Sequence, residues 1–129
     1  MLNDPLAAIL SKIMNAERVG KKEVVIRPAS KMIKQILTIM NENNFIGSFE
    51  EISALKGGEL KVNLIGNING CGVIKPRFST KNNQFEKWEG RYLPAKDFGI
   101  VIVSTPAGIL THHQAKEKKI GGKLLAYCY

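Results

Sequence analysis

Residues 99–110 read GIVIVSTPAGIL, and this stretch decides how the second half of the chain is interpreted. A near-continuous apolar run from Phe98 to Ser104 is typical of a buried strand. Pro106-Ala107-Gly108 supplies turn-forming residues, and the apolar, β-branched segment Ile109 to Thr111 follows. The stretch therefore predicts two strands joined by a tight turn that the sheet holds rigidly.

The residues around this hairpin predict a lobe that is mostly β. On its C-terminal side, a short helix is expected over 112–119 and a last strand over 123–128. On its N-terminal side, residues 73–74 begin a strand that Pro76 interrupts. Residues 79–97 show weak periodicity and many polar side chains, so they are interpreted as mostly irregular.

The first half of the chain predicts helices and strands in the order α-β-α-β-β. Apolar residues recur at helical spacing after Asp4-Pro5, a typical helix start, and again after Ser30, a good N-cap. Strands are expected at 23–27, 49–55 and 60–65. This order predicts a small sheet with two helices on one face.

A boundary is expected at residues 66–72, GNINGCG, which are dense in turn formers. The fold class is therefore predicted as α+β with two small lobes. The N-terminal α/β lobe covers 1–66, and a C-terminal, mostly β lobe with a short helix covers 67–129.

The composition is that of a globular protein, with 44% apolar and 23% charged residues in a chain of 129. Such a composition excludes a disordered tail or a fibrous repeat. No apolar run approaches the ~20 residues of a membrane span. Asp4 stands where a secretory leader carries positive charge, and two distant cysteines form no CxxC motif. A cytoplasmic protein without a membrane partner is expected.

The formal net charge is +8, and the charge is uneven along the chain. Residues 1–64 carry 9 basic and 7 acidic residues, or +2, whereas residues 65–129 carry 10 and 4, or +6. A basic surplus favours a polyanionic partner, although charge that serves solubility alone would look the same. Any electrostatic contact with a polyanion is expected mainly from the second half.

No pattern typical of catalysis or of a cofactor is found in the sequence. His112 and His113 are adjacent, so on a helix they diverge by about 100° and are poorly placed to share a metal. Cys71 is a candidate nucleophile, but a single cysteine beside glycines is more often a small packing residue. No Walker loop or dinucleotide fingerprint is present. We expect no enzyme, no metal and no cofactor, with an enzyme using Cys71 or a histidine as the rival class.

Three segments carry groups suited to a polyanion. The Ser104–Gly108 turn offers hydroxyls and backbone N–H groups that bond phosphate, sugar or base edges, although it also fits an ordinary turn. The helix start at 28–31 suits a phosphate, although simple capping explains it equally. Lysines around Gly121-Gly122 would lie near the turn if the last strands pair, and otherwise form a solvated face. These lysines are Lys116, Lys118, Lys119 and Lys123.

Several ordered motifs make the chain similar to a known family over nearly its whole length. They are NDPLA at 3–7, IRPASK at 26–31, NGCGVIKPRF at 69–78, GIVIVSTPAGIL at 99–110 and GGK at 121–123. The chain resembles the universal small-subunit ribosomal protein eight family, in its archaeal and eukaryotic branch.

The resemblance implies a protein that binds a stem in the central domain of small-subunit ribosomal RNA and assists assembly without catalysis. It implies neighbouring small-subunit proteins as partners and a monomer when free. Binding of the protein's own messenger RNA, as a translational repressor, and a generic basic RNA- or DNA-binding module are the alternatives. The implied RNA-binding residues are Asp4, Lys12, Ser30, Lys31, Ser104, Thr105, Pro106, Ala107, Gly108, Gly121, Gly122 and Lys123.

Two positions depart from the family pattern. Pro106 stands where the family often has a serine, so a hydroxyl and an N–H are lost there. Lys123 stands where the bacterial branch has an acid, so we expect Lys123 to meet a phosphate instead. Lysine and arginine would supply salt-dependent affinity, and the turn would supply specificity for an irregular stem.

Overall fold

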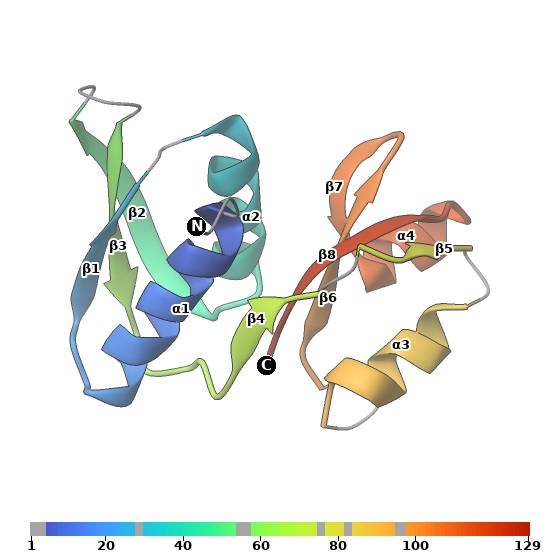
Figure 1. Cartoon of the computed structure of the whole chain (residues 1–129), viewed down its shortest axis with the longest axis horizontal. Helices are drawn as coiled ribbons and strands as arrows, with labels where there is room; N and C mark the ends of the chain where they lie inside the picture. Colours follow the sequence, from blue (N-terminus) through green and yellow to red (C-terminus); the bar gives the residue numbers. More distant parts are fainter. Residues whose placement is uncertain (1–4, 28–29, 54–57, 75–76, 82–83, 95–97) are drawn as a thin grey trace. The chain divides into compact units, whose positions relative to one another are not determined.

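The computed structural model describes residues 5–27, 30–53, 58–74, 77–81, 84–94 and 98–129. The chain divides into two compact units, Met1–Gly70 and Cys71–Tyr129. Each unit contains its own sheet and its own helices (Figure 1). The predicted α+β class with two small lobes is confirmed.

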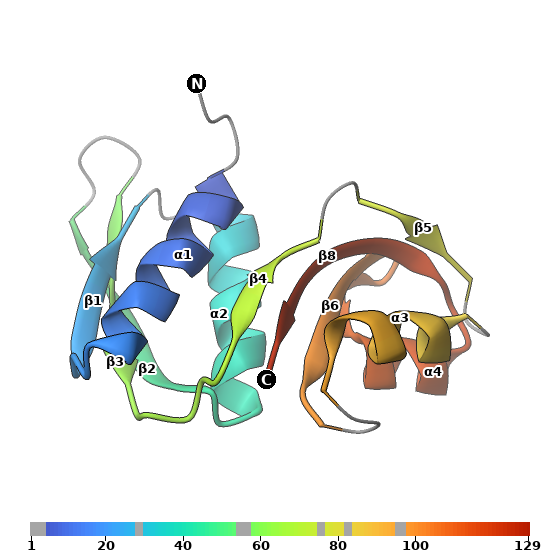
Figure 2. The same ribbon diagram turned by 60° about the horizontal axis from the view of Figure 1, so that its bottom comes forward.

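Within its described residues, the first unit contains two helices and an antiparallel sheet of three strands. Strand β3 lies between β1 and β2. Both helices cover the same face of the sheet (Figure 2), as expected. In chain order the elements are α1 (Pro5–Arg18), β1 (Glu23–Ile26), α2 (Lys31–Glu42), β2 (Ile46–Ser53) and β3 (Glu59–Leu64).

The core of the first unit lies between the helices and the sheet. The apolar stripes that recur at helical spacing in the sequence are the buried sides of α1 and α2, as expected from their periodicity. The expected cap of α2 is present, because the Ser30 hydroxyl accepts a hydrogen bond from the Ile33 N–H at 3.2 Å. The largest fully buried side chains of this unit are Leu6, Leu10, Ile13, Ile26, Ile33, Ile36, Leu37, Met40, Ile46 and Leu60.

The second unit is built around a sheet of five strands in which β8 has the most partners. One edge of β8 pairs with β4 and β5, and its other edge pairs with β6, which in turn pairs with β7. The elements are β4 (Cys71–Val73), β5 (Ser79–Thr80), α3 (Phe85–Tyr92), β6 (Ile100–Thr105), β7 (Gly108–Thr111), α4 (His112–Lys118) and β8 (Gly122–Cys128). The expected hairpin, the helix after it and the last strand are confirmed.

The interpretation of residues 79–97 as mostly irregular is wrong. This segment contains β5 and a two-turn helix, α3, so the second unit has two short helices in its described residues rather than one. Phe85, Trp88 and Glu89 are spaced i, i+3, i+4 and form the buried side of α3. The pattern was hidden because one of these three core positions is a glutamate.

One face of this sheet packs against both helices. The buried cluster on that face joins Val101, Val103 and Leu124 of the strands to Phe85 and Trp88 of α3, with Ala115 of α4. No helix in the described part of the chain is long and apolar enough to cross a membrane.

Candidate nucleic-acid interface

The hairpin of β6 and β7 ends in the two-residue tip Pro106-Ala107, which is exposed. Thr105 and Gly108 form the last pair of the ladder below the tip. Gly108 has a φ of +113°, a conformation that L side chains rarely adopt, so glycine is required at this position. The tip therefore has a defined shape on a rigid, buried strand.

The Thr105 hydroxyl holds the shape of this turn. It donates a hydrogen bond to the Gly108 carbonyl at 2.7 Å and accepts one from the Ala107 N–H at 3.2 Å. The Thr105 hydroxyl and the Ala107 N–H, which the sequence indicated as candidate ligand-binding groups, are thus used within the turn. The Ser104 hydroxyl is exposed and has no hydrogen-bond partner among the described residues, so it is the hydroxyl of this segment that is open to a ligand.

Strand β8 brings a lysine next to this serine. Lys123 lies directly opposite Ser104 on β6 and directly opposite Ser79 on β5. All three side chains are exposed. Val103 precedes Ser104 and Leu124 follows Lys123, and both apolar residues belong to the cluster under α3 and α4. Because successive side chains of a strand point to opposite faces, Ser104, Lys123 and the paired Ser79 lie on the face that these helices do not cover. Of the four lysines expected near the turn, Lys123 is placed there by its pairing with Ser104. We call Ser79, Lys123 and Ser104 the polar row.

Gly121 and Gly122 allow the strands of the polar row to approach one another. A Cβ at Gly121 would lie 2.2 Å from the Thr80 carbonyl oxygen. A Cβ at Gly122 would lie 2.2 Å from the Ser104 carbonyl oxygen. Because both obstacles are backbone atoms, no side chain fits at either position without displacing a strand.

Ser79 was not found from the sequence. Its only signal is that it alternates with Phe78, which is half-buried, and Thr80, which is buried. A strand of two residues is too short for that alternation to be recognised. The register of β5 on β8 is what places Ser79 in the polar row.

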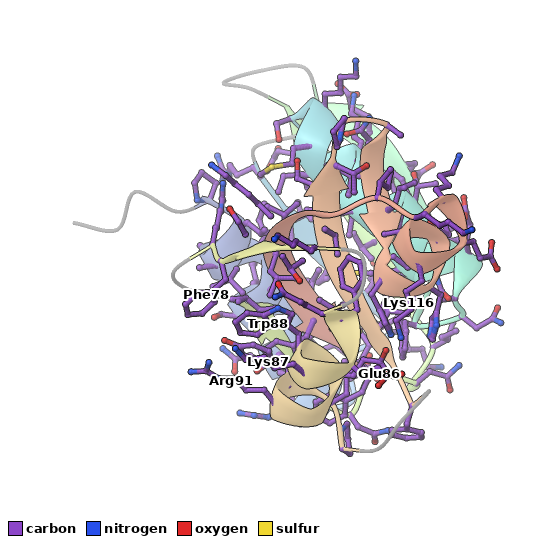
Figure 3. The ribbon with its side chains drawn as sticks, turned by 90° about the vertical axis from the view of Figure 1, so that its right-hand side faces the viewer. Phe78, Glu86, Lys87, Trp88, Arg91 and Lys116 are labelled. Atoms are coloured by element: carbon purple, nitrogen blue, oxygen red, sulfur yellow. The ribbon has the colours of Figure 1, made fainter. Side chains whose placement is uncertain are left out.

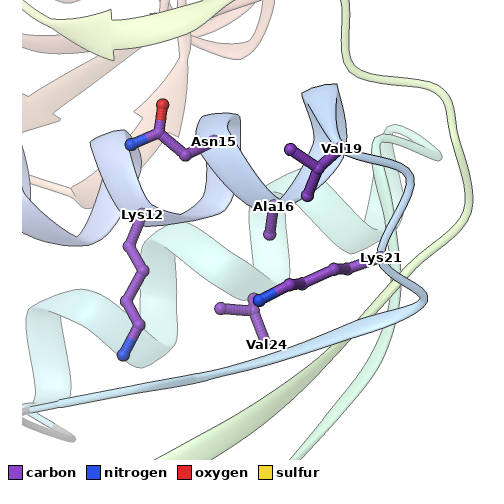
Figure 4. A pocket seen from close by; sticks show the side chains of 6 residues that line it. All are labelled: Lys12, Asn15, Ala16, Val19, Lys21 and Val24. Carbon is purple, nitrogen blue, oxygen red and sulfur yellow. The ribbon is translucent and has the colours of Figure 1, made fainter.

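The remaining predicted contacts belong to the first unit. Ser30 and Lys31 are exposed at the start of α2, and the Ser30 hydroxyl is engaged in the cap. Asp4, predicted both as a helix cap and as an RNA contact, lies outside the described residues. Lys12 and Lys21 reach over the space between α1 and β1 (Figure 4). This groove of about 280 Å³ is lined by Lys12, Asn15, Ala16, Val19, Lys21 and Val24.

A capping box fixes the start of α4 directly after β7. The Thr111 hydroxyl accepts from the Gln114 N–H at 3.2 Å, and the Gln114 side chain accepts from the Thr111 N–H at 3.1 Å. The helix ends at Lys118, and its C-cap residue, Lys119, adopts the left-handed conformation. Lys118 and Lys119 are exposed and Lys116 is half-buried, so the lysines do not form one uniform solvated face.

Beneath the sheet, α3 and α4 share a buried group of charged and polar side chains. The His112 Nδ1 accepts a hydrogen bond from the Val101 N–H at 3.0 Å, and its Nε2 lies 3.3 Å from a Glu89 carboxylate oxygen. Lys116 donates a hydrogen bond to the same oxygen. Burial, together with the nearby His113 and Lys116, lowers the pKa of His112 to about 4 although Glu89 faces it. The imidazole is therefore neutral near pH 7.

The pKa of Glu89 is shifted by the same neighbours. Burial raises the pKa of this carboxyl, but the hydrogen bond from Lys116 and the charges of His112, Lys116 and His113 together bring it below the usual range. The carboxylate therefore stays ionised near pH 7 and pairs with the Lys116 ammonium. The group joins α3 to α4 through the Glu89–Lys116 ion pair, while the second Glu89 carboxylate oxygen and His112 Nε2 are buried without a hydrogen-bond partner among the described residues.

The candidate catalytic residues do not form a constellation in the described part of the chain. The His112 and His113 rings lie 3.9 Å apart, but both nitrogens of His112 face protein groups. Cys71 lies directly opposite Cys128 in the β4–β8 pair. Among the described residues, no three His, Cys, Asp or Glu side chains are grouped so that they could hold a metal.

A family model described as ribosomal protein S8 matches residues 4–129. The chain belongs to the ribosomal protein S8 family. Ribosomal protein S8 is a protein of the small ribosomal subunit that binds ribosomal RNA and functions in translation. The S8 family is a structural family of the ribosome and not a family of enzymes. The resemblance seen in the sequence is thus confirmed, and the S8 match covers both units.

Proposed function

We propose that this chain binds a stem in the central domain of small-subunit ribosomal RNA directly and assists the assembly of that domain. Binding requires no chemical step. The protein is proposed to act in the cytoplasm, to be a monomer when free, and to meet other small-subunit proteins only in the particle.

The observation that carries this proposal is the polar row beside the β6–β7 turn. Lys123 lies between Ser79 and Ser104 in the strand register, and all three side chains are exposed. A cation between two hydroxyls suits a phosphate, because the ammonium supplies charge and each hydroxyl can donate a hydrogen bond to phosphate or ribose oxygens. The row therefore supports contact with a nucleic-acid backbone.

The β6–β7 turn supports recognition of a particular stem. Regular A-form RNA hides its base edges in a narrow major groove, so a rigid protrusion gains most where the minor groove is wide or distorted. The Thr105 hydrogen bonds and Gly108 give the turn one shape before binding. A preorganised turn loses little conformational entropy when it meets the RNA.

Residues of the first unit are proposed to add contacts. Lys12, Ser30 and Lys31 are exposed and carry charge or hydroxyl groups, and Asp4 belongs to the same predicted set. In this proposal the lobe over 67–129 supplies the main contact, because it holds both the turn and the polar row.

The test is binding of the full chain to a central-domain stem and to an unrelated stem of equal length over several salt concentrations. We expect a preference of a hundredfold or more for the central-domain stem, about 2.7 kcal/mol, that persists at moderate salt. Equal binding to both stems that collapses with salt would contradict the proposal and leave a generic basic module.

A second arm of the same experiment uses the messenger RNA that encodes this chain. Tighter binding to that message than to the ribosomal stem would favour translational repression as the main role. We expect the ribosomal stem to bind more tightly, because the resemblance makes direct binding to ribosomal RNA the primary role of the chain.

A further inference from the structure

Helix α3 of the second unit carries cations on one side and core residues on the other. Phe85, Trp88 and Glu89 are buried, whereas Lys87 and Arg91 are exposed. Figure 3 shows Lys87 and Arg91 on the same side as Phe78, while Glu86 projects to the other side. The exposed edge formed by Phe78, Lys87 and Arg91 is called the α3 edge below.

A ladder of aromatic rings lies directly behind this edge. Phe78 stacks on Trp88 at 4.8 Å between ring centroids, and Trp88 and Tyr92 follow at 6.4 Å. The series continues from Tyr92 to Tyr127 at 5.6 Å and on to Tyr129 at 6.1 Å. Since Phe78 is only half-buried, the ladder ends at a ring that solvent can reach.

The cations of the α3 edge rest on these rings. The Arg91 guanidinium lies 5.5 Å from the centre of Phe78 and 5.7 Å from the centre of Trp88. The Lys87 ammonium lies 5.1 Å from the centre of Trp88. Such contacts restrict long, flexible side chains without neutralising their charge. Both cations are thus partly ordered before any ligand arrives.

Lys87 and Arg91 form no ion pair with an acidic side chain in the described residues, whereas several other basic side chains do. Lys34 pairs with Glu51 at 2.7 Å, and Lys61 pairs with Glu23 at 3.4 Å. Lys116 pairs with Glu89. No carboxylate of the described chain lies within ion-pair distance of Lys87 or Arg91, so their charge is available to an external anion.

From this geometry we infer that the α3 edge is a second RNA-binding surface, which holds the phosphodiester backbone through Lys87 and Arg91. A guanidinium that packs on a ring keeps its N–H edge free, and that edge matches two phosphate oxygens. Phe78 offers a half-exposed ring on which a base can stack. The inference takes RNA as the anion and so rests on the proposed function for its ligand.

The α3 edge is separate from the β6–β7 turn. The two lie at opposite ends of the second unit (Figure 1). The polar row also lies on the sheet face that α3 does not cover. Because Phe78 of the α3 edge directly precedes Ser79 of the polar row, the complete small-subunit RNA, which offers every segment to both surfaces, is the appropriate probe.

The first experiment compares the double variant Lys87→Gln/Arg91→Gln with the wild type on complete small-subunit RNA. Loss of two phosphate contacts is expected to lower the magnitude of the salt slope, d log K/d log[salt], by about 1.4–1.8. Affinity at 0.1 M salt should fall roughly tenfold or more. The matched control is Lys34→Gln/Lys61→Gln, which removes the same charge from paired lysines and should leave the slope unchanged.

Trp88 reports on this surface directly, because it is the one tryptophan of the chain. RNA binding should change its fluorescence at the same midpoint as the binding curve, and the double variant should lose that change. If Arg91→Gln disturbs packing, Lys87→Gln alone keeps the aromatic ladder and should still lower the slope by about 0.7–0.9.

The outcomes separate this inference from the proposed function. Unchanged slope and affinity in the double variant would overturn the α3 edge as an RNA contact even if the wild type prefers its stem. A variant that binds naked RNA normally but enters RNA–protein particles poorly would also overturn it and indicate an acidic protein partner. A wild type without stem preference would contradict the proposed function, while a reduced slope in the double variant would still support the α3 edge.

Discussion

Ser104 on β6 lies directly opposite Lys123 on β8, at the end of the sheet from which the hairpin tip projects. The pairing sets two exposed residues side by side, a lysine and the serine that precedes Thr105 at the turn. A phosphate held by Lys123 would therefore fix the RNA backbone next to the tip. Lys123 by its charge and the β6–β7 turn by its shape would thus contact neighbouring parts of the same RNA.

Replacing Lys123 by alanine tests the charge in this arrangement. We expect Lys123→Ala to lower the magnitude of the salt slope on the cognate stem by about 0.7–0.9, since one phosphate contact is lost. Titrations at five salt concentrations measure it. Lys34→Ala, which removes a lysine already paired with Glu51, serves as the control. An unchanged slope for Lys123→Ala would show that this lysine does not contact a phosphate.

Thr105→Val tests whether the shape of the turn matters for binding. The variant keeps the side-chain volume but removes both hydrogen bonds that the hydroxyl makes within the turn. We expect binding to the cognate stem to weaken by about 1–3 kcal/mol, with little effect on the salt slope. Thr105→Ser keeps the hydroxyl and should bind nearly as well as the wild type. Equal affinity of all three proteins would rule out a role for the turn's internal hydrogen bonds.

Gly122→Ala tests the close approach of β8 to β6. The added methyl would meet the Ser104 carbonyl oxygen at 2.2 Å, so the strands must separate. We expect the free energy of unfolding to fall by about 1–3 kcal/mol, as for other overpacked sites. Thermal and urea unfolding would measure the change. Gly90→Ala on α3 has no atom within 4 Å of the new methyl and is the matched control. It should be stabilising by about 0.5–1 kcal/mol.

The stability of the second unit should depend on pH through His112. The unfolded imidazole has a pKa near 6.5, whereas burial lowers the folded value to about 4. Between these values the unfolded state binds more protons, so stability is full above about pH 6.5 and is lost as pH falls toward 4. The maximum slope from one histidine is about 1.4 kcal/mol per pH unit.

The control for this prediction is His112→Asn, which can still accept a hydrogen bond from the Val101 N–H but does not titrate. Its free energy of unfolding should vary less between pH 6.5 and 4. The Glu89 carboxylate adds to this loss only below about its unfolded pKa of 4.5, because its folded pKa is lowered from that value. Parallel pH curves for wild type and variant would contradict the assignment to His112.

The elements that could be predicted from the sequence are those with strong local signals. The apolar run that became β6, the Ser30 cap and the stripes of α1 and α2 each depend on residues close in the chain. Helix α3 was missed because Glu89 occupies a core position, where it pairs with Lys116 from 27 residues away. A partner at that separation cannot be inferred from local periodicity.

In the candidate site, too, the residues with local sequence signals could be predicted and those that depend on long-range contacts could not. The turn and Gly121–Lys123 were selected from motifs, and their pairing followed once both segments formed strands. Ser79 and the α3 edge depend on register and on ring contacts between separate segments. The use of the Thr105 hydroxyl within the turn also required three-dimensional geometry, since the motif alone suggests a group that faces outward.

The many partners of β8 have a consequence for the order of folding during synthesis. β4, β5 and β6 are all made before the strand that joins them. The second unit therefore cannot close its sheet until residues 122–128 have been added, whereas all strands of the first unit precede residue 65. We expect the first unit to fold earlier on the growing chain and the polar row to form last. A translation product that stops before residue 122 would thus lack a completed RNA-binding face.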